Sequence, residues 1–295
     1  MTAFRRQLMI KAKVIPTIPN YFCIVPLVDG VTVSITKKGS INNATLQYST
    51  NGDTWTNYTI GNTITLNNGQ KLYWKGTNRQ FATSTSKYHK FNISGDCNLK
   101  GNTMSLLYDD DFENKTTFDS VNYIFTNFFK DCDIVDASEL ELPARTLKQY
   151  CYSYMFYNCT SLKVPPSALP AKTLTTYCYY QMFQNCASLT TAPTIAATTL
   201  AENCCNNMFY GCTSLTTAPV LHALTLKKFC YNSMFRYCNK LNYVKAMFTT
   251  APSSTYTSSW MQGVSSSGTY VMNKNATYSS RGISAIPNNW TIEKV

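Results

Sequence analysis

The chain has 295 residues, of which 44% are hydrophobic and only 14% are charged, so it can bury a large core. Its formal net charge of +11 divides into a basic first hundred residues (+9), an acidic segment over 101–150 (−6) and a basic remainder (+8). This alternation and the lack of a Lys/Arg-rich run argue against a nucleic-acid groove, and no stretch approaches the ~20 apolar residues of a membrane span.

The start of the chain lacks the pattern of a secretory signal peptide. Arg5 and Arg6 come early, but Lys11 and Lys13 interrupt any apolar core and no small-residue cleavage site follows. The 12 cysteines would also be awkward in an oxidising compartment.

Residues 1–100 predict a small antiparallel β-sandwich, which we expect to act as a docking domain. Apolar and polar residues alternate in TVSITK (32–37), ATLQYST (44–50), TITLNN (63–68) and QKLYWKG (70–76). Asn51-Gly52 and Asn68-Gly69 are hairpin signals between these runs. STNGDTW (49–55) resembles a degenerate Asp-box, a hairpin motif of sialidases and other glycan-handling proteins, which implies that Trp55 anchors a hairpin.

Residues 101–120 form an acidic linker or N-terminal cap. Asp109, Asp110, Asp111 and Glu113 lie close enough in sequence to be a calcium candidate, although the spacing and glycine of an EF-hand loop are missing. A solvated turn whose acidic side chains cap the first predicted helix is the alternative interpretation.

From residue 121 onward the sequence repeats itself. The segment CYSYMFYNCTSL (151–162) returns as CYYQMFQNCASL (178–189), CCNNMFYGCTSL (204–215) and CYNSMFRYCNKL (230–241), at steps of 26 or 27 residues. Degenerate copies around Phe128-Phe129 and Trp260 extend the series to about six repeats. The predicted structural core comprises Met155, Cys159, Met182, Cys186, Met208, Cys212, Met234, Cys238 and Trp260.

Each repeat predicts a short helix followed by a short strand. Cys151, Met155 and Cys159 are spaced i, i+4, i+8, which is the pattern of one apolar helix face, and TSLTTAPVL (213–221) suits a strand. On a helix Cys151 and Cys159 would lie roughly 12 Å apart, too far for a disulfide or a shared zinc ion. We therefore interpret the cysteines as buried packing residues, with disulfides between neighbouring repeats as the alternative.

The run MFYGCTSLTTAPVL (208–221), with its variant at 182–195, resembles the BspA-type leucine-rich repeats of surface proteins from gut anaerobes and of the phages that infect them. Residues 258–292 resemble the closing segment of such proteins, although Ala196 and His222 stand where the family pattern has a proline such as Pro170. The resemblance implies a right-handed solenoid that binds proteins or glycans. The predicted fold is α+β: an N-terminal antiparallel β-sandwich, an α/β leucine-rich-repeat solenoid of about six repeats over 121–250, and a degenerate last repeat with a C-terminal β cap over 251–295.

The sequence offers little for catalysis. The only histidines are His89 and His222, and no nucleophile, zinc or nucleotide-binding motif is present, so we expect a non-enzymatic protein without a cofactor. Tyrosine and arginine are common at binding hot spots. The candidate binding residues are Tyr152, Tyr157, Tyr179, Gln184, Tyr210, Tyr231 and Arg236, and the alternative is that the tyrosines only help to cover the core.

These features favour a phage virion component, a fibre or decoration protein, over a bacterial cell-surface BspA-like adhesin. The expected partners are other virion or surface proteins and a host-surface glycan or protein, with self-association into a homo-oligomer left open.

Overall fold

The computed structural model describes residues 18–295, and the first 17 residues, which the expectation of no signal peptide concerns, lie outside them. The structure is mostly β, with 29% strand and 4% helix. Within the described residues the only α-helices are α1 (Ser105–Tyr108) and α2 (Ser254–Thr257), which are single turns, and η1 (Asp109–Asp111) is a 3-10 turn. The predicted α/β leucine-rich-repeat solenoid is therefore wrong, although a β-rich fold fits part of the expectation. No helix in the described part is long and apolar enough to cross a membrane.

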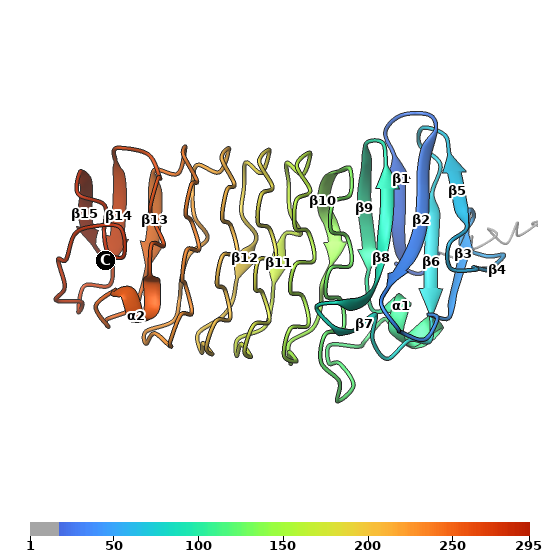
Figure 1. The fold of residues 1–295 in the computed structure, drawn as a ribbon, viewed down its shortest axis with the longest axis horizontal. Coiled ribbons are helices and arrows are strands. Elements are labelled where there is room, and N and C mark those ends of the chain that lie inside the picture. Colours follow the sequence, from blue (N-terminus) through green and yellow to red (C-terminus); the bar gives the residue numbers. More distant parts are fainter. Residues whose placement is uncertain (1–17) are drawn as a thin grey trace, which may run out of the picture.

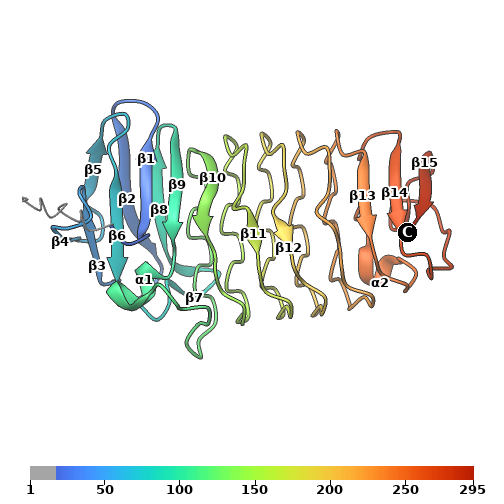
Figure 2. The ribbon, with the colours of Figure 1, turned by 180° about the vertical axis from the view of Figure 1, so that it is seen from behind.

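Two sheets form one end of an elongated molecule (Figures 1 and 2). The first contains, in spatial order, β10 (Ile134–Glu141), β9 (Cys97–Asn102), β1 (Phe22–Pro26), β6 (Leu72–Gly76), β3 (Leu46–Ser49) and β4 (Thr56–Asn57). The second contains β5 (Thr63–Leu66), β2 (Val31–Lys38), β8 (Lys87–Ser94) and β7 (Ala82–Ser84).

The two sheets pack through aromatic side chains. Phe22 of β1 and Trp74 of β6 place their rings 5.7 and 5.3 Å from the ring of Phe91 on β8, both edge to face. Asn51-Gly52 joins the paired strands β3 and β4. By contrast, the turn at Asn68-Gly69 links β5 and β6, which belong to different sheets, so the hairpin expected there is wrong.

Strand β10 joins these sheets to the repeats. It runs parallel to β9, with Leu140 opposite Gly101, and its residues belong to the first repeat. The thiol of Cys132, in the first repeat, donates to the carbonyl of Phe91 at 3.1 Å. The first repeat therefore bonds directly to β8. The core is consequently continuous from the N-terminal sheets into the repeats.

Each predicted helix is instead a chain of tight turns. In the second repeat the amides of Cys151, Met155 and Cys159 each donate to the carbonyl three residues earlier, at 3.2–3.3 Å. The amides between them donate out of the repeat: Tyr152 donates to Cys178 at 3.0 Å and Phe156 to Met182 at 2.9 Å. Main-chain donors therefore alternate between their own repeat and the next one.

Left-handed residues at every fourth position prevent an α-helix. In the second repeat Tyr150, Tyr154 and Asn158 have φ between 57° and 60°. The equivalent of Asn158 in the fourth repeat is Gly211, where a Cβ atom would lie 2.7 Å from Oδ1 of Asn185. The result is a period of four residues along the chain, which buries Cys151, Met155 and Cys159 just as a helix would.

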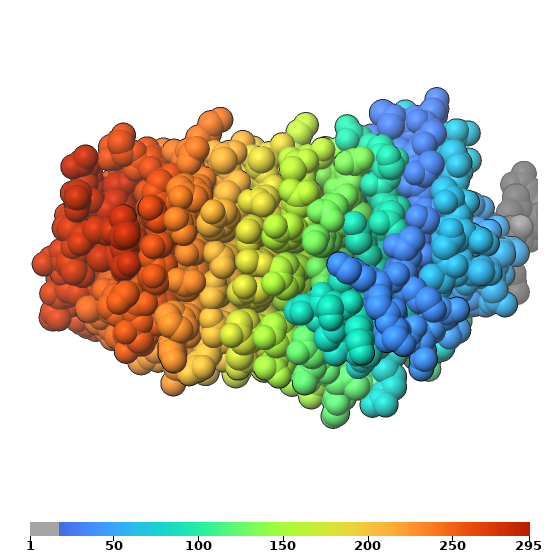
Figure 3. Space-filling model, in the orientation of Figure 1, coloured from blue at the N-terminus to red at the C-terminus, as the bar shows by residue number. Residues whose placement is uncertain are grey.

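The repeats stack side by side as a row of parallel loops that forms one continuous elongated surface (Figures 1 and 3). Opposite the turns, short segments lie parallel, among them β11 (Ala168–Leu169) and β12 (Thr194–Ile195). β10 and β11 do not pair with each other. Pro165 and Pro166, which precede β11, lack the amide hydrogens that a ladder with β10 would need.

A parallel sheet and two tryptophans close the C-terminal end. The sheet contains β13 (Tyr243–Ala246), β14 (Gly268–Met272) and β15 (Trp290–Lys294). The indole of Trp260 donates to the carbonyl of Ala285 at 2.8 Å, and that of Trp290 to Ser265 at 3.0 Å. The chain after residue 280 thus covers the last turn segment.

We expect Met208→Asp to unfold the repeat stack. Met208 is completely buried, and an unpaired carboxylate there would cost a large part of the ~5–15 kcal/mol that stabilises a typical domain. Circular dichroism during thermal and urea unfolding measures the loss. Thr216→Asp, at an exposed position of the same repeat, is the matched control, and a folded Met208→Asp protein would contradict the packing described here.

Candidate functional site

Four of the predicted binding residues form one column on the turn side of the stack. Tyr157, Gln184, Tyr210 and Arg236 occupy equivalent positions in successive repeats, and all are half-buried. We call this set the turn-side column. Because every repeat has the same main-chain geometry here, these side chains share one face of the molecule.

Cations lie against aromatic rings at both ends of the turn-side column. The ammonium of Lys130 lies 5.0 Å from the ring centre of Tyr157. The guanidinium of Arg236 lies 4.8 Å from the ring centre of Tyr237 and 5.9 Å from that of Tyr210, and it donates to the Tyr237 hydroxyl at 3.0 Å. Such contacts restrain long side chains before a partner arrives, which lowers the entropy lost on binding.

The other three predicted binding residues do not reach the surface. Tyr152, Tyr179 and Tyr231 are 1–2% exposed, and burial raises the pKa of each hydroxyl well above its ordinary value. Their rings fill the space between repeats; those of Tyr152 and Tyr179 stack with centres 6.1 Å apart. Their assignment to a binding surface is therefore wrong, because no side-chain area is available to a ligand.

The methionine, cysteine and Trp260 columns lie in the core, as their sequence pattern suggested. All twelve cysteines of the chain are buried and none forms a disulfide. The second cysteine of each repeat is also a hydrogen-bond donor: the thiol of Cys159 donates to the carbonyl of Phe129 at 3.0 Å, and that of Cys186 to Phe156 at 3.1 Å. Burial raises the pKa of Cys151 to about 12, so a reactive thiolate is disfavoured there.

A stack of tyrosines beside the turn-side column was missed in the sequence. The rings of Tyr123, Tyr150 and Tyr177 lie parallel at centre distances of 4.8 and 4.6 Å, with Tyr180 edge-on to Tyr177. Burial and the neighbouring tyrosines raise the pKa of Tyr150 to about 12. The signal was present as a tyrosine before the first cysteine of two repeats, but the assumed helix gave that position no special role.

The acidic segment forms ion pairs with a lysine, and the calcium candidate formed by Asp109, Asp110, Asp111 and Glu113 is wrong. The ammonium of Lys75, which is only 7% exposed, lies 2.8 Å from Asp110 and 3.0 Å from Asp109, the latter without hydrogen-bond geometry. The ammonium of Lys75, on β6, therefore already balances the charge of these carboxylates. In the described residues no group of three or more His, Cys, Asp or Glu side chains is arranged to hold a metal ion.

Trp55 belongs to the same cluster. Its ring lies 4.7 Å from the Lys75 ammonium and 4.8 Å, edge to face, from the ring of Tyr21, whose hydroxyl donates to Asp110. Since Lys75 and Tyr21 cover Trp55, its visible role is to fix the hairpin between β3 and β4 onto the sheet.

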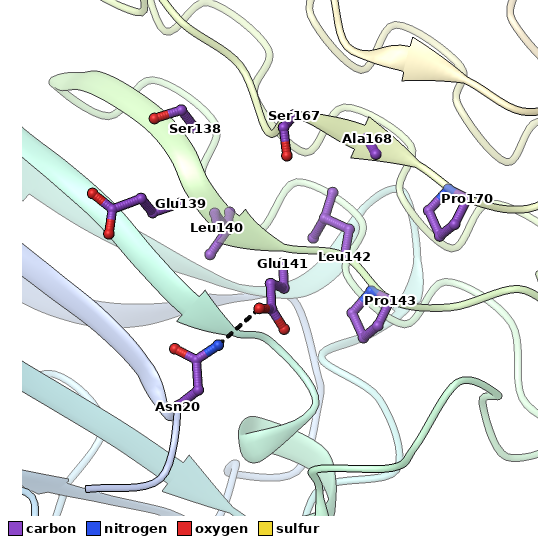
Figure 4. Close-up of a pocket in the computed structure, with 10 residues that line it drawn as sticks. All are labelled: Asn20, Ser138, Glu139, Leu140, Glu141, Leu142, Pro143, Ser167, Ala168 and Pro170. Carbon is purple, nitrogen blue, oxygen red and sulfur yellow. Dashed lines mark hydrogen bonds between the residues drawn. The ribbon is translucent and has the colours of Figure 1, made fainter. Parts of the chain in front are cut away.

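A polar pocket of about 430 Å³ lies between β10 and β11 (Figure 4). Glu139 and Glu141 of β10 face it beside Asn20, whose amide donates to Glu141 at 2.9 Å. In parallel ladders alternate residues bond to opposite neighbours. Since β10 pairs with β9, and β11 with β12, the amide and carbonyl groups of Leu140 and Ala168 point toward the pocket. The site can offer hydrogen bonds from both strands to a polar ligand.

Comparison of the chain with protein-family models, with curated proteins and with solved structures gave no match. The resemblance to BspA-type repeats therefore stays a prediction from the sequence.

We expect Asp110→Asn to reduce the dependence of stability on acid. Burial alone would raise the Asp110 pKa, but the hydrogen bonds from Lys75 and Tyr21 outweigh it and hold the pKa below its ordinary value. The stabilising contribution is therefore present above the unfolded-state pKa, near 3.9, and is lost as pH falls through the folded-state value.

Urea unfolding over a pH series tests this expectation. The free energy of unfolding should fall less steeply with acid in Asp110→Asn than in the wild type. Asp111→Asn, at an exposed neighbouring position, should follow the wild type. Equal slopes for all three proteins would show that the bonds from Lys75 and Tyr21 to Asp110 do not contribute to the pH dependence of stability.

Proposed function

We propose that the protein is a non-enzymatic recognition protein whose repeat stack binds a protein or a glycan through the turn-side column. The observation that carries this proposal is the constant register of Tyr157, Gln184, Tyr210 and Arg236 on one rigid face. Tyrosine and arginine give large contact areas and directed hydrogen bonds at little entropic cost when they are held in place. The cation–ring contacts of Lys130 and Arg236 supply that restraint.

We further propose that this recognition takes place on a virus particle, with the protein acting as a fibre or decoration component. Twelve buried cysteines without a disulfide support assembly in a reducing compartment, since secreted proteins tend to oxidise their cysteines. The N-terminal sheets, which lie at one end of the molecule, would dock on the particle and leave the repeats projecting (Figure 2). A bacterial cell-surface adhesin is the alternative.

Mass spectrometry of purified virus particles and of washed cell envelopes from the native source separates these two locations. We expect the chain in the particles at a fixed ratio to capsid protein. Enrichment in the envelopes would favour the adhesin and contradict the virion proposal, while leaving the binding face to be tested separately.

Substitution of the turn-side column tests the binding face. We expect the triple variant Tyr157→Ser, Tyr210→Ser, Arg236→Ser to lose binding of the labelled protein to host cells by a factor of about 30 or more, since a hot-spot residue contributes about 2 kcal/mol. Lys163→Ser, at an exposed position outside the column, is the control. Unchanged binding by a folded triple variant would contradict the assignment of this face.

A further inference from the structure

A second hollow lies between two neighbouring repeats, where the strand side leads into the turns. It has a volume of about 410 Å³ and lies between residues 145–147 of one repeat and residues 170–175 of the next. We call it the corner pocket. Its lining includes no residue of the turn-side column, so the two surfaces are independent of each other.

Two cations stand side by side in the corner pocket. Thr146 and Thr173 are paired by a parallel main-chain bridge, and they directly follow Arg145 and Lys172, respectively. The two basic residues therefore occupy equivalent positions on main chains about 4.8 Å apart. Both residues are exposed, and both line the pocket. Like charges at such neighbouring positions repel each other.

Within the described part of the chain, no carboxylate balances this pair. The ion pairs of residues 18–295 involve only the cations Lys75, Arg79, Lys90 and Lys100, which lie in or beside the N-terminal sheets. Residues 142–250 hold nine Lys or Arg residues and a single acid, Glu202. The repeats therefore present a positive field, which attracts anions to the pocket.

The rest of the lining suits a sugar ring beside the charged group. Exposed Thr146 and Thr173 add hydroxyl groups, which can both donate and accept hydrogen bonds. Half-buried Pro170 supplies an apolar wall, and buried Leu147 lies beneath it. The volume of the pocket lies within the usual range for small-ligand sites, which leaves room for more than a bare ion.

We propose that the corner pocket binds one acidic sugar unit, a uronic acid or a sulfated hexose. The carboxylate or sulfate lies between Arg145 and Lys172, because a guanidinium can hold such a group through two parallel hydrogen bonds. Ring hydroxyls bond to Thr146 and Thr173, and the carbon face of the ring packs on Pro170. A neutral sugar would leave the two like charges unbalanced, so the acidic group determines the specificity.

Calorimetric titration of the full chain tests the proposal. The probes are galacturonic acid, glucuronic acid and galactose 6-sulfate, with galactose as the neutral counterpart and inorganic sulfate as the bare anion. Each is titrated at low salt to about 10 mM, above the ~1 mM dissociation constant of a weak small-ligand site. We expect at least one acidic sugar to bind saturably, tighter than galactose and inorganic sulfate by a factor of about ten or more. Added salt should weaken this binding, because it screens the charges.

Arg145→Gln and Lys172→Gln each remove one charge and keep a polar side chain. We expect each change to weaken binding of the acidic sugar by a factor of about five or more, because a charge-assisted hydrogen bond is lost. Lys163→Gln, at an exposed position outside the pocket, should bind like the wild type. Circular dichroism verifies that the variants are folded, which the exposure of all three positions favours.

Three results would overturn the proposal. They are the absence of saturable binding with all three acidic sugars, an equal affinity for inorganic sulfate, which would show an unspecific anion site, and wild-type affinity in the folded Arg145→Gln and Lys172→Gln proteins. None of these results bears on the turn-side column, because that face is tested by its own variants.

Discussion

The fold depends on how main-chain hydrogen bonds are divided in the turn segments. Alternate amides close turns within their own repeat, and the amides between them donate to the next repeat. The left-handed conformation at every fourth residue makes this division possible, because it turns the chain before a helix can form. Side-chain packing follows from it: Phe156, Phe183 and Phe209 stack with ring centres 5.3 and 5.5 Å apart because their main chains are bonded in register.

The sequence predicted the columns well and the local structure poorly. Cys151, Met155 and Cys159 were correctly placed on one buried face, but their spacing of four fits a chain of turns as well as a helix of period 3.6. Over eight residues the two periods differ too little to separate. The distinguishing signal was at Asn158 and its equivalent Gly211, since Asn and Gly are the residues that best tolerate a left-handed conformation.

The residues of the candidate site were likewise predicted only in part. The turn-side column was found because its residues directly follow the Met-Phe pair in each repeat. Tyr152 was misplaced, although its equivalent in the fourth repeat is Cys205, a small residue typical of cores. Lys75 could not be linked to Asp110 from sequence, because the ion pair depends on how the loop after β9 folds back onto β6.

The unequal bonding of the two sides gives the molecule a mechanical polarity. Along the turns, amide-to-carbonyl bonds join each repeat to the next from Tyr123 to Trp260. Along the opposite side, β10 bonds to the next repeat at Val135 and Ala137, but the ladder stops at Val164 and the two-stranded sheet β11–β12 is not joined to it. The turn side is therefore stiff, and the side that contains Pro165 and Pro166 is easier to deform. Bending of the molecule would open that side first, beyond Val164, while the turn-side column keeps its spacing.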